Sequence, residues 1–455
     1  MTTLDLIVQG DIVLPEGNIK NGLLGILDGR IAGIFDEAAT PPHREAVRAR
    51  GQYVLPGMID GHVHCFSAPN EGFTKGTRAA AAGGVTTIIE MPYDLGRPVM
   101  SRDKFLDKQQ RLEAESLVDV ALLATIKKTG GLDQIPLMAE AGACGIKASL
   151  FETDPDRFPR IPDGELFEAF KLVRETGLPI GVHAENDELV RWTTKLARRD
   201  GSDPSAHCRS RPVVVESSAV VKALEFAHTT GAHLHIYHAS SARVFELVAW
   251  YRQQGTRATA ETCTHYLTLA EEDMGRLKAK GKINPPLRPA AEHEKLWALC
   301  AAGQVDMLTS DHSPLLLEYK TQPNIFDNAS GAPGVQTIVP MIYSEGVAKG
   351  RITIHDMARL LSQRPAEIFG LAHRKGQIRI GADADLTIID PGAEWVLDEA
   401  DQLSSAGWSP YHGWPMRGKV TRTILRGQVI YDSEQVLAEP GTGSFVPGKH
   451  RQGNR

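Results

Sequence analysis

The sequence has few cysteines and no long apolar run. Its five cysteines lie far apart and include no C-x-x-C pair, which disfavours a disulfide framework and a cysteine-built zinc site and favours a reducing compartment. No apolar stretch approaches the roughly 20 residues that span a bilayer. The N-terminal MTTLDLIVQGDIVLP carries acidic residues early and lacks the basic segment and apolar run of a secretory signal. We therefore expect a cytoplasmic protein without a membrane partner.

The chain also lacks an excess of basic charge. Its 50 Lys and Arg against 56 Asp and Glu leave a net charge of −6, and no run is rich in Lys or Arg, so a nucleic-acid partner is not expected. The 455 residues are 42% hydrophobic and 23% charged, a composition able to bury a sizeable core. A single α/β barrel can take up about 200 to more than 400 residues.

Strand-like segments rich in apolar and β-branched residues occupy both ends of the chain. They read LDLIVQGDIVL and GLLGILDGRIAGIF near the N-terminus, and DADLTIID and VTRTILRGQVIYD near the C-terminus. We predict one small β-sandwich domain formed from both ends, residues 1–52 and 374–455. The polar, glycine-rich tail from 441 to 455 is expected to be loosely held.

The middle of the chain, residues 53–373, alternates between short apolar runs and helix-like segments such as PDGELFEAFKLVRETG. The eight apolar runs are 54–64, 85–92, 118–126, 144–150, 179–186, 233–240, 257–264 and 305–314. Strands that alternate with helices form parallel sheets, and eight is the number that closes a (β/α)8 barrel. The predicted fold is thus an α/β barrel with a small β domain.

Polar residues cluster where five of these eight runs end. Residues i and i+2 of a strand share a face, so His62 and His64 can reach one point. Further candidates at the same rim of the barrel are Lys147, His183, His238 and Asp311. Active sites of such barrels gather at this rim, and neutral imidazole is a common ligand for transition metals. Together the residues predict a metal site.

Each residue also has a structural interpretation. His183 and His238, taken singly, fit core histidines better than ligands. Lys147 could be a surface lysine and Asp311 a helix N-cap. The alternation of the sixth run places His233 and His235 on the opposite face, where we expect structural roles. His265 and His312 lie beside the predicted site, and the sequence leaves their roles open.

The motifs that carry these residues resemble those of the amidohydrolase superfamily, and more narrowly of its cyclic amidohydrolases: hydantoinase (dihydropyrimidinase), allantoinase and dihydroorotase. The matching segments are LPGMIDGHVH, GGVTTIIEMP, GIKASL, VHAEND, ETCTHYL, INPPLR, SDHSP and KGQIRIGADADLTIID. They cover most of the chain. SDHSP and ETCTHYL look more like allantoinases, whereas DGELFEAF followed by VHAEN looks more like hydantoinases, so the choice between them stays open.

The resemblance implies a centre of two divalent metal ions. Zinc is the metal that we expect, and ligand type alone also allows manganese, cobalt or iron. Its ligands would be His62, His64 and Asp311 for one ion, His183 and His238 for the other, and Lys147, carboxylated on Nζ, as the bridge. A carbamate between two cations is electrostatically sensible, whereas an ammonium is not. A hydroxide between the ions would open a cyclic amide to an N-carbamoyl acid, with Asp311 as proton shuttle.

The resemblance also suggests contacts to the substrate. Asn284 would offer a backbone contact, and Ser330 stands where many hydantoinases have Asn. Dihydropyrimidinase-type enzymes carry an oxyanion-stabilising Tyr five residues after the bridging lysine. Here that residue is Glu152, a poor donor when ionised. Either another group acts on the oxyanion or the loop is rearranged, and the dihydropyrimidinase assignment is weakened.

Two positions bear on substrate charge. Dihydroorotase-like enzymes read H-x-H-L-R and M-P-N, whose Arg and Asn grip a substrate carboxylate. This chain has Phe66 and Tyr93 at those positions, so we predict an uncharged cyclic ureide or imide as substrate. Arg97 or Arg288 could supply a charge from another direction.

Three alternatives remain at this point. They are a dihydroorotase, another hydrolase of the superfamily such as a deaminase or phosphotriesterase, and a metal-free relative without catalysis. Homotetramers are common among the cyclic amidohydrolases, so the resemblance also implies a homo-oligomer.

Overall fold

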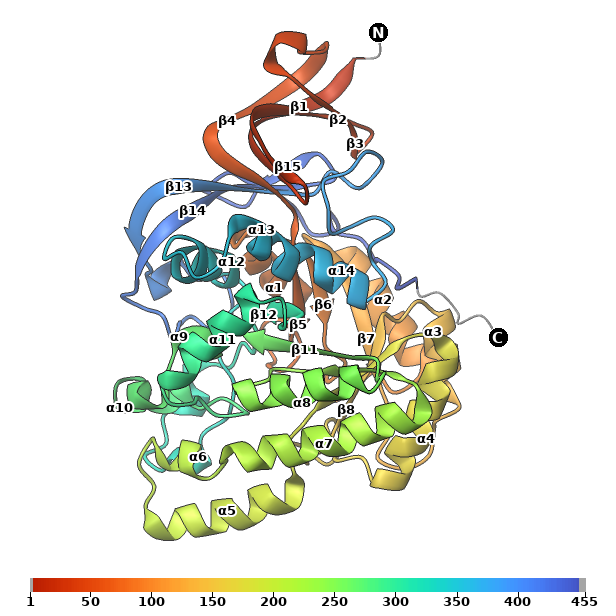
Figure 1. The fold of residues 1–455 in the computed structure, drawn as a ribbon, viewed down its shortest axis with the longest axis vertical. Helices are drawn as coiled ribbons and strands as arrows, with labels where there is room; N and C mark the ends of the chain where they lie inside the picture. The colour runs from red at the N-terminus through yellow and green to blue at the C-terminus, as the bar shows by residue number, and fades with distance from the viewer. Residues whose placement is uncertain (1–2, 450–455) are drawn as a thin grey trace.

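The computed structural model describes residues 3–449, and its centre is a barrel of eight parallel strands in chain order (Figure 1). The strands are β5 (Met58–Val63), β6 (Val85–Glu90), β7 (Asp119–Thr125), β8 (Gly145–Ser149), β9 (Pro179–His183), β10 (His233–Ile236), β11 (Ala258–Cys263) and β12 (Met307–Thr309). Each lies within one of the eight predicted runs, which confirms the barrel. A parallel bridge between Val63 and His312 brings the first and last strands together.

Helices follow the barrel strands along the chain, and several of them pack on the outside of the barrel (Figure 1). They are α1 (Gly72–Ala82), α2 (Arg102–Glu115), α3 (Gln134–Glu140), α4 (Asp163–Thr176), α5 (Asp187–Asp200), α6 (Ala206–Arg209), α7 (Val213–Thr230), α8 (Ala242–Gln253), α9 (Thr264–Thr268), α10 (Met274–Leu277), α11 (Ala291–Ala301), α12 (Ile338–Ile342), α13 (Ile354–Ala358) and α14 (Arg364–Ile368). Gly177 and Gly231 end α4 and α7 in the left-handed conformation, with φ of 77° and 74°, a conformation that glycine adopts without strain.

Both chain ends contribute to one seven-stranded mixed sheet, as predicted for the small β domain. Its order is β15-β14-β13-β4-β1-β2-β3. The bounds are β1 (Leu4–Leu14), β2 (Gly17–Leu27), β3 (Arg30–Phe35), β4 (His43–Pro56), β13 (Leu386–Val396), β14 (Pro415–Leu425) and β15 (Gln428–Tyr431). β4 joins the two ends, because it pairs in parallel with β1 and antiparallel with β13. It stops at Pro56, and the barrel begins at Met58.

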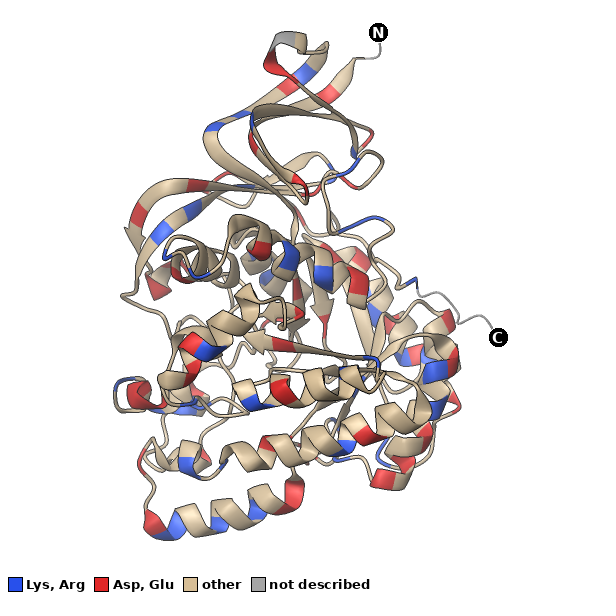
Figure 2. Cartoon of the chain, viewed as in Figure 1, with Lys and Arg blue, Asp and Glu red and all other residues tan. Residues whose placement is uncertain are grey.

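A buried ion cluster ties this sheet to the barrel. Lys375 Nζ lies 2.5 Å from Asp119 of β7, 2.9 Å from Asp383 and 2.6 Å from Asp385. The lysine side chain is 1% exposed, and a buried charge of this kind is tolerated only when it is paired. Cations and anions are interspersed along the outer helices in the view of Figure 2.

The expectation of a loose tail is wrong for residues 441–449. Val120 of β7 donates its amide to Ser444 O (3.0 Å) and accepts from Val446 N (2.9 Å), and the Val446 side chain is fully buried. This pairing joins residues far apart in the sequence, so the polar composition of the tail gave no sign of it. Residues 450–455 lie outside the described part. Within 3–449, no helix is long and apolar enough to cross a membrane.

Candidate metal centre

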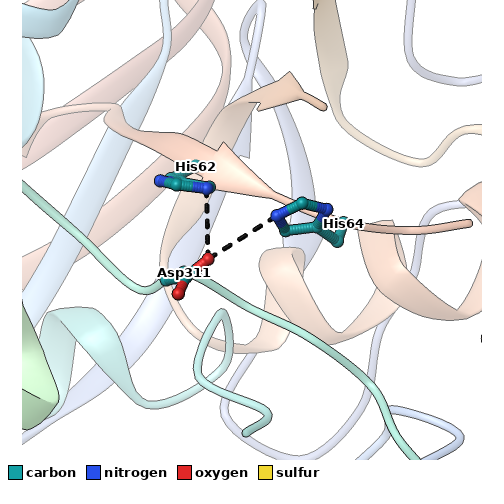
Figure 3. A group of neighbouring side chains, drawn as sticks. All are labelled: His62, His64 and Asp311. Carbon is teal, nitrogen blue, oxygen red and sulfur yellow. Dashed lines mark ion pairs between the residues drawn. The ribbon is translucent and has the colours of Figure 1, made fainter. Parts of the chain in front are cut away.

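The ends of β5 and β12 bring together His62, His64 and Asp311 (Figure 3). Asp311 Oδ1 lies 3.1 Å from His62 Nε2 and 3.6 Å from His64 Nε2, and one ligand atom from each residue lies within 4.8 Å of the others. Asp311 has a φ of 49°, and such strain in a non-glycine residue is often stored at functional sites. The next residue, His312, bridges to Val63 and Ala332, so Asp311 does not cap a helix.

Lys147 reaches the same point from the middle of β8. Its side chain is 1% exposed, so it is not a surface lysine, and Nζ lies 2.8 Å from His62 Nε2. The Tyr237 ring lies 4.3 Å from Nζ. Burial lowers the pKa of Lys147 to about 8, although the charges of Asp311 and Glu261 oppose the shift. A neutral amine is therefore accessible near neutral pH.

The second histidine pair lies at the ends of β9 and β10. His183 Nδ1 faces His238 Nε2 at 2.8 Å, and His183 Nε2 lies 2.9 Å from Glu185. His238 Nδ1 is buried without a hydrogen-bond partner, and the residue has a φ of 42°. The His238 ring stacks on His62 with centroids 5.4 Å apart, so the two groups of predicted ligands adjoin.

The donor set at His62, His64 and Asp311 fits a divalent cation. Burial, reinforced by the charge of Lys147, lowers the pKa of His62 well below its ordinary value. Burial also lowers the pKa of His64 to about 4, against the opposing effect of Asp311, and that of His238 well below its usual range. Neutral imidazole is the form that binds metal. The chain thus presents neutral nitrogens and a carboxylate at one point.

Sequence reasoning missed two buried carboxylates behind the histidines. Glu261 of β11 lies 2.6 Å from His62 Nδ1, and Glu185 contacts His183 and forms an ion pair with Arg211. Burial alone would raise the pKa of Glu185, but Arg211 and His183 hold it at about 2. The sequence offered one weak signal for each. Glu261 is an acidic residue inside an apolar strand, in TAETC, and Glu185 follows the predicted ligand His183 by two residues, in HAE.

The other histidines have varied surroundings. His235 Nε2 lies 3.2 Å from Glu261, and His233 contacts the Thr259 hydroxyl at 3.1 Å. His312 exchanges backbone hydrogen bonds with residues of β5 and its end, and its ring lies 3.3 Å from Glu71. His265 is buried, with Nε2 unpartnered.

Tyr93, one of the predicted substrate contacts, lies near the centre. Its ring stacks on Phe158 at 3.7 Å, and both rings lie within 6 Å of Lys147 Nζ, at 5.7 and 5.9 Å. Asn284 is half-buried, and its Oδ1 has no hydrogen-bond partner. Ser330 is half-buried in the loop that Gly331 fastens through its amide to Lys282 O.

Phe66 and Glu152 make other contacts. The Phe66 ring packs on Phe73 (4.9 Å) and under the guanidinium of Arg111 (4.1 Å). The Glu152 carboxylate pairs with Lys128 at 2.5 Å, and both side chains are partly exposed. Neither set of contacts includes the six residues of the centre.

Of the two arginines considered for anion binding, Arg97 is exposed. Arg288 is buried, and it donates to Ser240 Oγ at 2.8 Å and to Glu216 at 3.3 Å. Its charge is therefore already paired within the protein.

Comparison with known proteins shows to which family this barrel belongs. The profile of the Amidohydrolase family matches residues 53–430. The chain belongs to this family. It is 38% identical to the allantoinase of Deinococcus radiodurans over 445 residues, 96% of this chain and 98% of the relative. It is 39% identical to the allantoinase of Rubrobacter xylanophilus over the full length of both.

A solved structure of the L-hydantoinase (dihydropyrimidinase) from Arthrobacter aurescens has the same fold. It superposes with a TM-score of 0.95 at 32% identity, covering 98% of this chain and 100% of that one. The resemblance read from the motifs is confirmed, and the protein is a cyclic amidohydrolase of the allantoinase and hydantoinase group.

Proposed function

We propose that this amidohydrolase opens the ring of an uncharged cyclic ureide to give an N-carbamoyl acid. Two divalent ions, of which zinc is our first choice, would be held by the six residues of the centre: His62, His64, Lys147, His183, His238 and Asp311. One observation carries the proposal: Lys147 Nζ and Asp311 Oδ1 lie 2.8 and 3.1 Å from the same nitrogen of His62. These three groups are close enough together to bind one cation.

Lys147 is suited to carboxylation. A neutral amine attacks carbon dioxide, an N–C bond forms, and the nitrogen loses a proton, so that an anionic carbamate results. Burial favours this step, because it lowers the pKa of Lys147 to about 8. The carbamate would replace a positive group by a negative one beside two cations, which is favourable at such short range.

Asp311 would move the proton. When bound, divalent ions lower the pKa of water toward 7 and polarise the substrate carbonyl. Burial would raise the pKa of Asp311, but its hydrogen bond with His64 helps to hold that pKa below its ordinary value. Asp311 is then a carboxylate at neutral pH, able to accept a proton from water and deliver it to the leaving ring nitrogen.

The surroundings favour a neutral ring. The aromatic pair Tyr93–Phe158 lies beside Lys147, and Arg288 is engaged with Glu216. A substrate carboxylate left unpaired in a partly dry pocket would cost several kcal/mol. We propose allantoin as the preferred substrate, because the relatives named allantoinase are 38–39% identical to this chain, whereas the L-hydantoinase of known structure is 32% identical. Hydantoins with a 5-substituent come next.

The test is metal removal and return. Protein stripped with a chelator should lose ring opening of allantoin, and about two equivalents of zinc per chain should restore it, with an N-carbamoyl acid as product by NMR. Full activity in metal-free protein would contradict the proposal, as would release of ammonia in place of ring opening. Light scattering on the same samples checks the expected homotetramer.

A further inference from the structure

Glu261 is a buried carboxylate on which three nitrogen atoms converge. Its side chain is 0% exposed. Oε1 lies 2.6 Å from His62 Nδ1 and accepts from the backbone amide of His238 at 3.1 Å, and Oε2 lies 3.2 Å from His235 Nε2. The carboxylate therefore joins residues of both predicted ligand pairs.

These contacts assign the protons on the rings. In its ionised form Glu261 can only accept, so His62 Nδ1, at 2.6 Å, must then carry the proton. His62 Nε2 is then a free lone pair, directed at the point shared by Lys147 and Asp311. His235 completes the arrangement: its Nδ1 lies 2.9 Å from the Thr259 hydroxyl, which can donate to it, so that Nε2–H faces Glu261.

We infer that Glu261 is a positioning residue of the metal centre. Its carboxylate holds His62 in the tautomer whose Nε2 can bind a cation, and it fixes the backbone that presents His238. A histidine ligand is commonly oriented by such a carboxylate, and removal of the partner typically lowers metal affinity 10- to 100-fold. The inference rests on the proposed metal centre, because a tautomer matters only if His62 is a ligand.

The experiment measures metal release from the zinc-loaded full-length protein to a chromogenic chelator. Glu261→Ala should lower zinc affinity by about 10- to 100-fold. Glu261→Gln keeps the shape but offers one acceptor and one donor group where three N–H groups converge, so we expect a smaller loss, of about 10-fold, at the lower end of that range. In cobalt-loaded protein, both changes should alter the visible absorption bands, which report ligand geometry.

Glu345→Gln is the matched control. Glu345 is a carboxylate 4% exposed that accepts from Lys349 (2.6 Å) and Trp414 (3.0 Å). Its loss should lower thermal stability without changing metal release or the cobalt spectrum. That combination separates positioning of a ligand from general stabilisation of the fold.

The outcomes are distinct. If the parent protein binds no metal, the proposed centre fails together with this inference. If the parent binds about two ions and Glu261→Ala keeps its affinity within threefold with an unchanged cobalt spectrum, the inference alone is overturned. Should the alanine variant not fold, the isosteric Glu261→Gln decides in the same way: unchanged affinity and spectrum overturn the inference.

Discussion

Arg211→Met should destabilise the protein, because it would leave the buried carboxylate of Glu185 without its ion-pair partner. Glu185 is 0% exposed, and Arg211 is its ion-pair partner. Arg211 and His183 outweigh burial and bring the pKa of Glu185 from 4.5 to about 2. At 1.36 kcal/mol per pKa unit, the ionised carboxylate contributes about 3 kcal/mol at pH 7. Breaking a buried pair by removal of one partner costs about 3 to 5 kcal/mol.

The assay is thermal unfolding as a function of pH. Because the shift in Tm per kcal/mol falls with chain length, we expect a loss of about 5 °C at pH 7. The folded-state pKa of Glu185 is depressed, so its contribution is complete above pH 4.5 and fades as the pH falls toward 2. The difference between parent and variant should therefore shrink below pH 4.5.

Two controls sharpen the result. Arg191→Met breaks the pair with Asp187 (2.7 Å), in which the arginine is 61% exposed, and should cost less than about 1 kcal/mol. The double variant Arg211→Met/Glu185→Gln, which leaves no buried charge unpaired, should recover part of the loss. The prediction is wrong if the Tm of Arg211→Met lies within about 1 °C of the parent, or if the difference between the two stays constant down to about pH 3.

Three further outcomes follow from the site. Lys147→Ala should abolish ring opening, with partial rescue by short carboxylic acids that mimic the carbamate; full activity without additive would exclude the bridge. Asp311→Asn should keep most of the fold and lose several orders of magnitude in turnover, and retention of more than about a tenth would exclude the proton shuttle. Gly181→Ala should lower both Tm and activity, because the new Cβ would lie 2.0 Å from the Tyr237 ring beside Lys147, an overpacking that costs about 1–3 kcal/mol. The control Gly164→Ala has open space around its Cβ and should be neutral or stabilising, so equal losses in the two variants would contradict the packing argument.

Much of the fold was predictable because it depends on local periodicity. Apolar runs that alternate with helices define a parallel barrel, and parallel strands place their carboxyl ends at one rim. That rule alone brings His62, Lys147 and Asp311 together, although 249 positions separate the first residue from the last. The strand-like texture of both chain ends predicted strands there, and these strands form one sheet.

The remaining features depend on long-range contacts that a single sequence does not encode visibly. Glu261 contacts His62 across 199 positions, and no local pattern distinguishes it from any acidic residue in a strand. The pairing of Val120 with Ser444 depends on where the last loop runs. Glu152 occupies a position that the resemblance suggests is near the substrate, and its carboxylate pairs with Lys128. This ion pair depends on the course of the loop that carries Lys128, which the sequence around Glu152 does not indicate.

The substrate that we propose is an uncharged cyclic ureide. The most direct measurement compares kcat/KM for allantoin, 5-substituted hydantoins and dihydroorotate on protein loaded with about two zinc ions per chain. Phe66 and Tyr93 stand where the resemblance places the Arg and Asn of dihydroorotase-like enzymes, so we predict that allantoin or a hydantoin is preferred and that dihydroorotate is poor. A preference for dihydroorotate by about tenfold, or 1.4 kcal/mol, would contradict it.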